Sequence, residues 1–346
     1  MAVLYYNVVN RDDTTGQKIE DSENSYKSEW VYNVLSGKNP DGSDAEEYES
    51  MLSMLSDKNQ VSVKYLTSGG YPTFEIEGET ATKGLLGLAI ERGDCVAIID
   101  HFRNPTRAFT GTNSLIESED LKSLATEGTG EFATMFTPWA QYSTSFGTKL
   151  MAGSFGYLTA LAESIQSYPN FLAVAGTARG QLTNLVALDT YKVMPYKVVN
   201  DEYQSRDGIA INPITEITPY GWTIWGNRTL FDNSKRKNLV ARSFLNIRNM
   251  VSDIKKQAYV AAKRLMFEQD SDVLWMRFKA MVTPLLDSMK TGNGLSDYRV
   301  IRSTTKYDGS PLNKGEIAAI IRIFPKYAIE DWEITVVISD EEVSVE

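Results

Sequence analysis

The chain has 346 residues, of which 42% are hydrophobic and 23% are charged, and its formal net charge is −10. This composition is typical of a folded globular protein and excludes disordered and fibrous chains, while the length allows two domains. No stretch approaches the roughly 18 consecutive apolar residues of a membrane span, and residues 1–10 lack the pattern of a signal peptide. We therefore expect no membrane insertion.

The negative charge is concentrated at the two ends of the chain. Residues 1–80 contain 15 acidic and 6 basic residues, and residues 330–346 contain 7 acidic residues and no basic one. The region between them is therefore net basic. Because the chain as a whole is acidic and its basic stretch carries no base-stacking aromatic residues, we expect no nucleic acid partner.

Residues 61–167 alternate predicted strands with predicted helices. Apolar runs predict strands at 61–66, 95–100 and 132–137, and the intervening patterns predict helices near 80–92, 117–125 and 151–167. A continuous apolar strand such as CVAII is typical of a mainly parallel sheet that is covered on both faces. The sequence thus predicts an α/β domain over 61–234, after a loop-rich segment 1–60 that holds one helix near 45–55.

Residues 208–230, GIAINPITEITPYGWTIWGNRTL, form a joint between two unlike halves of the chain. Their β-branched residues, punctuated by Pro213, Pro219 and Gly221, predict two or three short strands. Downstream, apolar residues recur at alternating steps of three and four over a helix of about 27 residues. This apolar seam consists of Phe244, Ile247, Val251, Ile254, Ala258, Ala261 and Leu265.

A second helix is predicted near 270–289, beginning at an Asp/Ser-rich cap. Pro284 should kink this helix or restart it. Strands are then predicted at 298–302, 315–324 and 332–339. Two helices followed by strands predict an α+β domain over 235–346. The helix near 270–289 carries apolar residues on one side, namely Leu274, Phe278, Met281, Leu285 and Met289.

Basic residues gather on the long helix and just before it. They form either a solvated face or a surface that docks on an acidic protein, and the acidic tail makes another copy of the chain one candidate partner. The candidate interface residues are Lys235, Arg236, Lys237, Arg242, Arg248, Lys255, Lys256, Lys263 and Arg264.

The last seven residues continue an apolar alternation without an obvious partner strand in the sequence. Such a segment can complete the sheet of a neighbouring molecule. We therefore predict a strand-donating arm composed of Asp340, Glu341, Glu342, Val343, Ser344, Val345 and Glu346.

Catalytic and ligand-binding motifs are absent from the sequence. Asp100 and His101 end a predicted strand, yet neighbouring residues of a strand point to opposite faces, and no G-x-S-x-G motif occurs. The segment GTARGQ (176–181) matches neither phosphate-binding glycine motif, and Cys95 and His101 are each the single residue of their kind, so no cysteine or histidine metal cluster exists. We expect neither cofactor nor metal and no enzymatic activity, although paired carboxylates for glycoside chemistry remain open.

Seven segments together resemble the contractile tail sheath proteins of bacteriophages, tailocins and related contractile injection systems. They occur in family order from about residue 61 onward and cover most of the chain. The segments are KYLTSGGYPTF, LLGLAIERGDCVAIID, FATMFTPWAQ, FLAVAGTARG, the joint GIAINPITEITPYGWTIWGNRTL, LMFEQDSDVLW and GEIAAIIRIFPKYAIEDWEITVVI.

The resemblance implies a non-catalytic, subtilisin-like α/β sheath domain followed by a C-terminal α+β sheath domain. It further implies a structural subunit that forms hexameric rings in a helical sleeve, with the tail tube, baseplate and tail terminator proteins as partners, in a virion tail assembled in the bacterial cytoplasm. Contraction of the sleeve would drive the tube through the host envelope. The P-G-V-Y-V-E-E-like arm that opens most sheath proteins is not found in this sequence. Another tail component, of the baseplate or tube, or a hydrolase-like enzyme, is the alternative.

Overall fold

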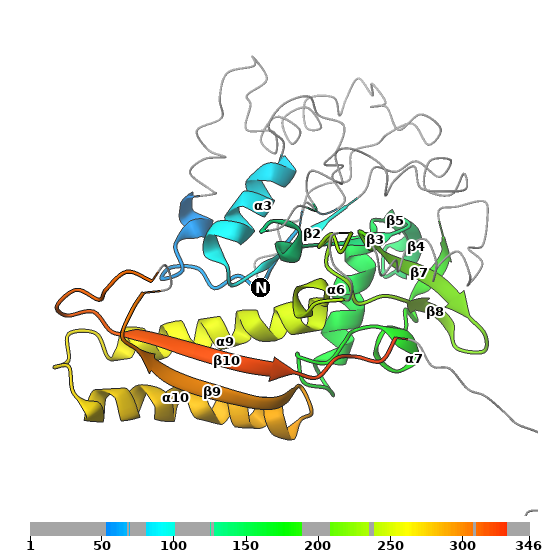
Figure 1. Cartoon of the computed structure of the whole chain (residues 1–346). Helices are drawn as coiled ribbons and strands as arrows, with labels where there is room; N and C mark the ends of the chain where they lie inside the picture. Colours follow the sequence, from blue (N-terminus) through cyan, green and yellow to red (C-terminus); the bar gives the residue numbers. More distant parts are fainter. Residues whose placement is uncertain are drawn as a thin grey trace, which may run out of the picture.

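The computed structural model describes residues 53–67, 69, 81–100, 125, 128–188, 208–234, 239–306 and 309–330. Figure 1 shows two parts, a sheet with helices on its faces and a layer of two long helices and a β-hairpin. Several predictions fall outside these residues: the helix near 117–125 apart from residue 125, the strand 332–339, the arm 340–346, Lys235–Lys237 and His101. Residues 53–56 are helical and belong to the end of the helix predicted near 45–55.

A five-stranded sheet organises the first part. Its strand order is β1-β2-β3-β7-β8, with β1 (Tyr65–Thr67), β2 (Val96–Ile99), β3 (Ala133–Thr137), β7 (Asn212–Ile217) and β8 (Gly221–Ile224). The first four strands are parallel, and β8 returns antiparallel to β7. The prediction of a mainly parallel sheet is confirmed, and the joint contains two of the expected short strands.

Helices cover both faces of this sheet, which explains why β2 and β3 are buried along their whole length. In β2, Ala97 and Ile99 belong to the core beneath α3 (Ala81–Arg92), whereas Val96 and Ile98 belong to the core beneath α6 (Gly153–Ser164). Alternate residues of one strand therefore enter two different cores. Gly153 lets α6 begin directly against β3, because a Cβ atom there would collide with the carbonyl oxygen of Phe136.

A second sheet of three antiparallel strands was not predicted. Its order is β5-β4-β6, formed by β4 (Ala140–Thr144), β5 (Gly147–Met151) and β6 (Leu185–Leu188). The signal was weak because β4 buries only its alternate residues Ala140 and Tyr142, and the first three residues of β5 are exposed. Short helical segments complete this part: η1 (Gly130–Phe132), α7 (Gly176–Arg179) and η3 (Ala241–Ser243).

The last part consists of α9 (Leu245–Arg264), α10 (Asp272–Thr291) and the hairpin of β9 (Leu295–Ser303) and β10 (Ala318–Pro325). The predicted α+β composition is confirmed, although α9 has 20 residues and is shorter than its pattern suggested. The predicted cap is present, since Leu274 N donates to Ser271 Oγ at 3.1 Å. In contrast, α10 does not restart at Pro284, because the flanking residues Val282 and Leu286 are fully buried and hold the helix in place.

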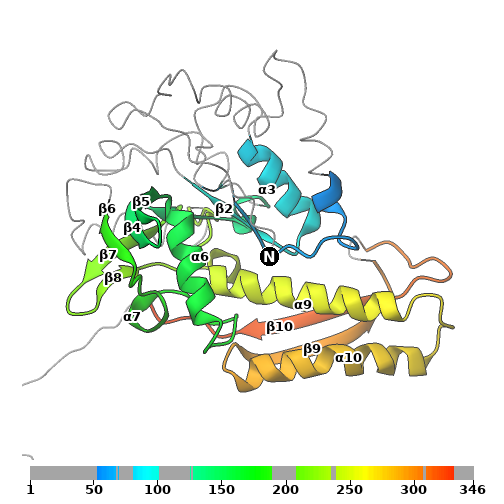
Figure 2. The same cartoon turned by 180° about the vertical axis from the view of Figure 1, so that it is seen from behind.

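A third core lies between α9, α10 and the hairpin. Ile247 and Ile254 of the predicted seam meet Val282 and Leu286 of α10, and the inward-facing strand residues close the cluster. Figure 2 shows α9 on the side of this layer that faces the first part of the molecule, with α10 on the far side. None of the helices among the described residues is both long and apolar enough to cross a membrane.

Candidate functional site

A buried polar network connects the first part of the molecule to the start of α9. Asn212 donates to Thr134 Oγ1, the Met135 carbonyl and the Arg228 carbonyl at 2.8–3.1 Å, and its Oδ1 atom accepts from Arg228 N at 2.7 Å. Asn227 Nδ2 in turn donates to Asn246 Oδ1 at 2.7 Å. Because each buried amide is satisfied in several directions, the network fixes the orientation of the joint.

Arg228 links this joint to the end of the described chain. Its side chain is 2% exposed, and its Nε and Nη2 atoms hold the two carboxylate oxygens of Glu330, with Nε–Oε1 at 3.0 Å. The guanidinium also lies over the Phe244 ring, 4.8 Å from its centroid, and Phe244 packs against Tyr327 at 5.2 Å. A two-point ion pair of this kind fixes direction as well as position. It therefore anchors the chain where it leaves the hairpin.

The inner face of α9 carries basic residues that bind the first part of the same chain. Arg248 Nη2 donates to the Gly93 carbonyl at 3.0 Å and its guanidinium lies 3.7 Å from the centroid of the Phe132 ring. Lys255 Nζ donates to the same carbonyl at 2.9 Å, and Lys256 Nζ donates to the Val63 carbonyl at 2.6 Å. Burial lowers the pKa of all three side chains. These cations lie in an intramolecular contact.

The remaining basic candidates lie nearer the surface. Arg242 pairs with Glu131 at 3.3 Å, and Lys263 Nζ donates to Asn59 Oδ1 at 2.8 Å from an exposed position. Arg264 is exposed at the end of α9. Sequence reasoning missed the acidic residue on this helix that takes part in the contact, Asp253, which pairs with Lys64 at 2.8 Å. Binding of another protein by these basic residues stays a prediction, and it concerns mainly the residues that are exposed.

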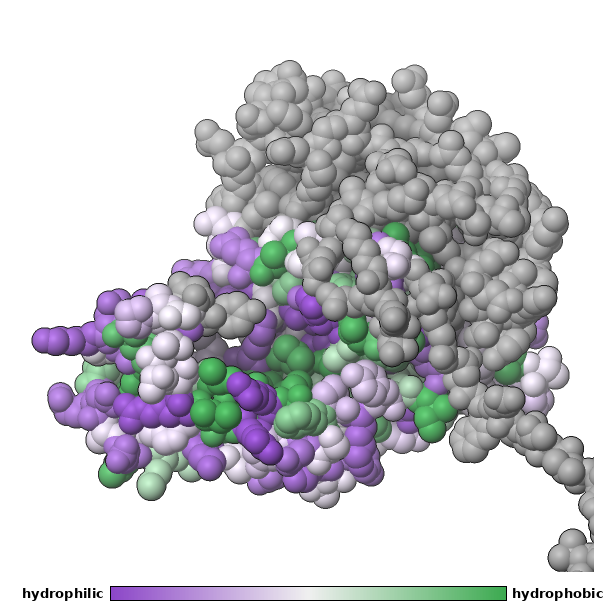
Figure 3. All heavy atoms as spheres, viewed as in Figure 1, coloured by the Kyte–Doolittle hydropathy of each residue, from purple (hydrophilic) through white to green (hydrophobic). Residues whose placement is uncertain are grey.

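The hairpin β9–β10 presents an outer face of mixed apolar and basic character. Opposite residues on this face are Ile301 with Ile320 and Arg299 with Arg322, and all four are exposed. The inner face packs Tyr298, Val300, Ile321 and Ile323 on the third core. In Figure 3, apolar and hydrophilic residues lie side by side over this region. Two arginines directly opposite each other repel, so this face favours an acidic partner.

Two segments were considered above for catalysis and for phosphate binding, namely Asp100 and GTARGQ. Both make structural contacts within the described residues. Asp100 is fully buried and caps the start of α6, accepting from Ser154 N at 3.1 Å and from Ser154 Oγ at 2.6 Å. Arg179 of the segment GTARGQ donates to the Ala173 carbonyl at 2.7 Å and covers the Tyr168 ring. Among the described residues, no group of three or more His, Cys, Asp or Glu side chains could hold a metal ion.

The two-part fold resembles that of chains from solved contractile injection systems. A chain of the PVC extracellular contractile injection system, in its contracted sheath complex, superposes with a TM-score of 0.59 at 18% identity, covering 80% of this chain and 71% of that one. A chain of the anti-feeding prophage baseplate superposes with a TM-score of 0.58 at 13% identity, covering 86% and 75%. At such low identity the likeness concerns the fold.

Two curated relatives by sequence carry the name Tail sheath protein, and they confirm the resemblance. The protein of Vibrio phage KVP40 is 26% identical over 181 residues, 52% of this chain and 25% of that protein. The protein of Enterobacteria phage T4 is 24% identical over 164 residues, 46% of this chain and 22% of that protein. The matched regions thus span a quarter or less of these relatives. No family model matches the sequence.

Proposed function

We propose that this chain is a structural subunit of a contractile tail sheath. Copies polymerise as a helical sleeve around a tail tube, and contraction of the sleeve drives the tube through the host cell envelope. The observation that carries this proposal is the sequence match to two phage tail sheath proteins over about half of this chain. The fold shared with chains of contractile injection systems supports it independently.

The finer assignments of the sequence analysis belong to the same proposal. The first domain, 61–234, is a non-catalytic, subtilisin-like sheath domain, and 235–346 is the C-terminal sheath domain. The capping role of Asp100 supports the absence of catalysis, because a carboxylate that is bound to a helix start and to Ser154 is engaged in structure. The proposed partners are other copies in hexameric rings, the tube, the baseplate and the tail terminator, in a tail assembled in the bacterial cytoplasm.

Strand donation is the proposed link between subunits. Within the described residues the hairpin is a two-stranded sheet, so each of its strands offers backbone groups to a further strand. The segment Asp340–Glu346 of a neighbouring copy is the proposed donor. Its acidic residues complement the arginine pair Arg299 and Arg322. A subunit that exchanges strands can stay connected while the array changes from one packing to another.

Electron microscopy of the purified chain, alone and with its tube protein, tests the proposal. We expect helical sleeves, whereas a baseplate component would form rings or small defined complexes. Deletion of residues 340–346 should abolish sleeves while the melting temperature of the monomer stays unchanged. Normal polymerisation of the truncated chain would refute strand donation. A full-length chain that stays monomeric, both alone and with the tube protein, would refute the proposed role as a sheath subunit.

A further inference from the structure

Strand donation, the proposed link between copies, requires that the donated strand bind one sheet edge and leave the others free. An edge strand offers unpaired backbone N–H and C=O groups, and these can pair with an extended segment of almost any sequence. The five-stranded sheet of the first part has two edge strands, β1 and β8. The contacts along these two edges therefore decide whether the central sheet competes with the hairpin for a donated strand.

The outer edge of β8 is occupied by residues 180–182 of the same chain. Leu182 N donates to the Trp222 carbonyl at 2.9 Å, and Ile224 N donates to the Gly180 carbonyl at 2.8 Å. This pairing is a single antiparallel bridge, too short to extend the sheet by a further strand. The segment therefore uses hydrogen-bonding groups of the β8 edge that an added strand would need.

Close packing holds residues 180–182 against β8. Leu182 is 3% exposed and belongs to the core beneath α6. Gly180 lies so near to Ala175 that a Cβ atom on it would come within 2.8 Å of the Ala175 Cα atom. The φ of Gly180 is −106°, so glycine is required here for space and not for an unusual backbone angle. The cover on β8 thus depends on the absence of one side chain.

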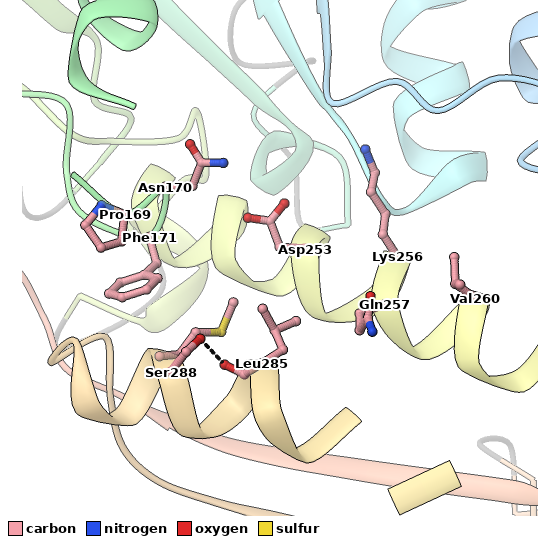
Figure 4. A pocket seen from close by; sticks show the side chains of 10 residues that line it. Pro169, Asn170, Phe171, Asp253, Lys256, Gln257, Val260, Leu285 and Ser288 are labelled. Carbon is pink, nitrogen blue, oxygen red and sulfur yellow. Dashed lines mark hydrogen bonds between the residues drawn. The ribbon is translucent and has the colours of Figure 1, made fainter. Parts of the chain in front are cut away.

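Helix α9 covers the entrance to the other edge strand, β1. The Lys64 carbonyl accepts from Val96 N of β2 at 3.0 Å, whereas the preceding Val63 carbonyl accepts from Lys256 Nζ of α9 at 2.6 Å. The Lys64 side chain pairs with Asp253 of the same helix at 2.8 Å. In Figure 4, which shows the open pocket between α9 and α10, Asp253 and Lys256 extend away from α10. The start of β1 is therefore enclosed by β2 and α9.

The hairpin differs from the central sheet in the length and the cover of its edges. β9 has nine residues and β10 has eight, whereas β1 has three and β8 has four. Within the described residues, β9 and β10 pair only with each other. The edge strands of the three-stranded sheet have five and four residues, and β5 carries the exposed Lys149, which disfavours pairing at an edge. Among the described strands, those of the hairpin thus offer the longest edges.

We propose that residues 180–182 and helix α9 act as edge guards, which confine strand donation between copies to the hairpin. The inference rests on the proposed function, because it names what excludes the donated arm from the central sheet. Gly180 determines this specificity, since it allows residues 180–182 to lie against β8. A side chain at this position should redirect part of the arms to β8 while the hairpin itself stays unchanged.

Photo-cross-linking from the arm tests the guard at β8 in assembled protein. Donor chains carry a benzophenone side chain at position 345, acceptor chains carry heavy isotopes, and mass spectrometry identifies the acceptor peptides that are captured. With wild-type acceptors, we expect peptides from β9 or β10 and none from β8. Acceptors with Gly180→Ala should give about a tenth or more of the captured peptides from β8, because the added Cβ displaces residues 180–182 and opens this edge.

Amide exchange and two control variants separate this effect from a loss of stability. The Ile224 amide, which bonds to the Gly180 carbonyl, should lose protection in Gly180→Ala. Phe136→Ala weakens β3, which β7 separates from β8, and should leave capture on the hairpin. Gly87→Ala, where a Cβ atom meets nothing within 4 Å, should change neither measurement.

Three results would overturn the inference and leave the proposed function intact. They are capture of β8 by wild-type sleeves, capture of the hairpin alone by Gly180→Ala, and an Ile224 amide that stays protected in this variant. Wild-type sleeves that capture no hairpin peptide overturn strand donation and the inference together. A wild-type chain that forms no ordered polymer overturns the proposed function as well.

Discussion

Strands β3 and β10 show how differently the two parts of the molecule use a β-strand. Every residue of β3 is buried, because helices cover both faces of its sheet. In β10, residues that pack on the third core alternate with exposed ones such as Ile320 and Phe324. The central strands are therefore covered on both faces, whereas the hairpin packs one face on the third core and exposes the other. We predict that the central sheet mainly stabilises the fold and that the exposed face of the hairpin contacts partners.

The largest effect should come from removing a side chain of the central sheet. Phe136→Ala should lower the free energy of unfolding by about 4 kcal/mol, because it leaves a cavity where the ring stacks on Tyr157 at 4.3 Å. The matched substitution on the hairpin, Ile320→Ala, should change it by about 0.5 kcal/mol or less. Urea denaturation measures both, and equal losses would remove the contrast between the two sheets.

Removal of the buried guanidinium at the joint should have the next largest effect. Arg228→Ala leaves the Glu330 carboxylate without its two-point partner and should cost about 3 kcal/mol. Arg242→Ala is the control, since this arginine is 44% exposed where it pairs with Glu131, and its loss should cost at most about 1 kcal/mol. Thermal unfolding of both variants should rank them in this order. The reverse ranking would contradict the role given to Arg228.

Charge reversal on α9 should lower stability at its inner basic residues and weaken binding at its outer ones. Lys256→Glu removes a charged hydrogen bond to the Val63 carbonyl and should cost about 1.5 kcal/mol. The double variant Lys263→Glu and Arg264→Glu should stay within about 0.5 kcal/mol of the wild type. It should instead weaken binding to the tube or to a neighbouring copy, measured by co-sedimentation. Full binding by the double variant would show that these residues only face solvent.

The smallest effect concerns pH at the far end of the hairpin. Hydrogen bonds from Asn313 N and Lys306 lower the pKa of Glu316 to about 2 from 4.5. A depressed carboxylate pKa stabilises the folded loop above pH 4.5, and this contribution is lost as the pH falls toward 2. The protection factors of the amides in residues 309–316, which correct for the pH dependence of intrinsic exchange, should therefore decrease over that interval in the wild type. Glu316→Gln should remove this change in protection, and an identical profile for both would exclude this carboxylate as its source.

The sequence predicted the elements whose residues have a strong periodic pattern. The apolar run CVAII predicted β2, because a strand that is buried on both faces is apolar at every position. The steps of three and four predicted α9, because a helix that is buried along one side repeats apolar residues at this spacing. The sheet of β4, β5 and β6 gave no such pattern, since only alternate residues of β4 and no residue of β5 are buried. Of the two outcomes expected at Pro284, a kink or a restart, the restart does not occur, because tertiary packing around it outweighs a local preference.

The candidate site was harder to predict than the fold. The sequence identified Arg248, Lys255 and Lys256 as cations on one helix, but only three-dimensional structure shows that they bind backbone carbonyls of the first part. Arg228 gave no signal, because its partner lies 102 residues away and a single arginine in a strand-rich segment is ordinary. Pairings between distant segments depend on topology, which residue order records only indirectly.

The ion pair between Arg228 and Glu330 also determines where a mechanical load enters the subunit. A pull on the chain beyond residue 330 acts on the guanidinium at the joint before it reaches the hairpin, and the buried amide of Asn212 holds the backbone of Arg228 in place. Force applied at this end is thus shared with Asn212 of β7 in the central sheet before it loads the pairing of β10 with β9. Under the proposed function, a pull from a neighbouring copy would therefore act on both parts of the subunit.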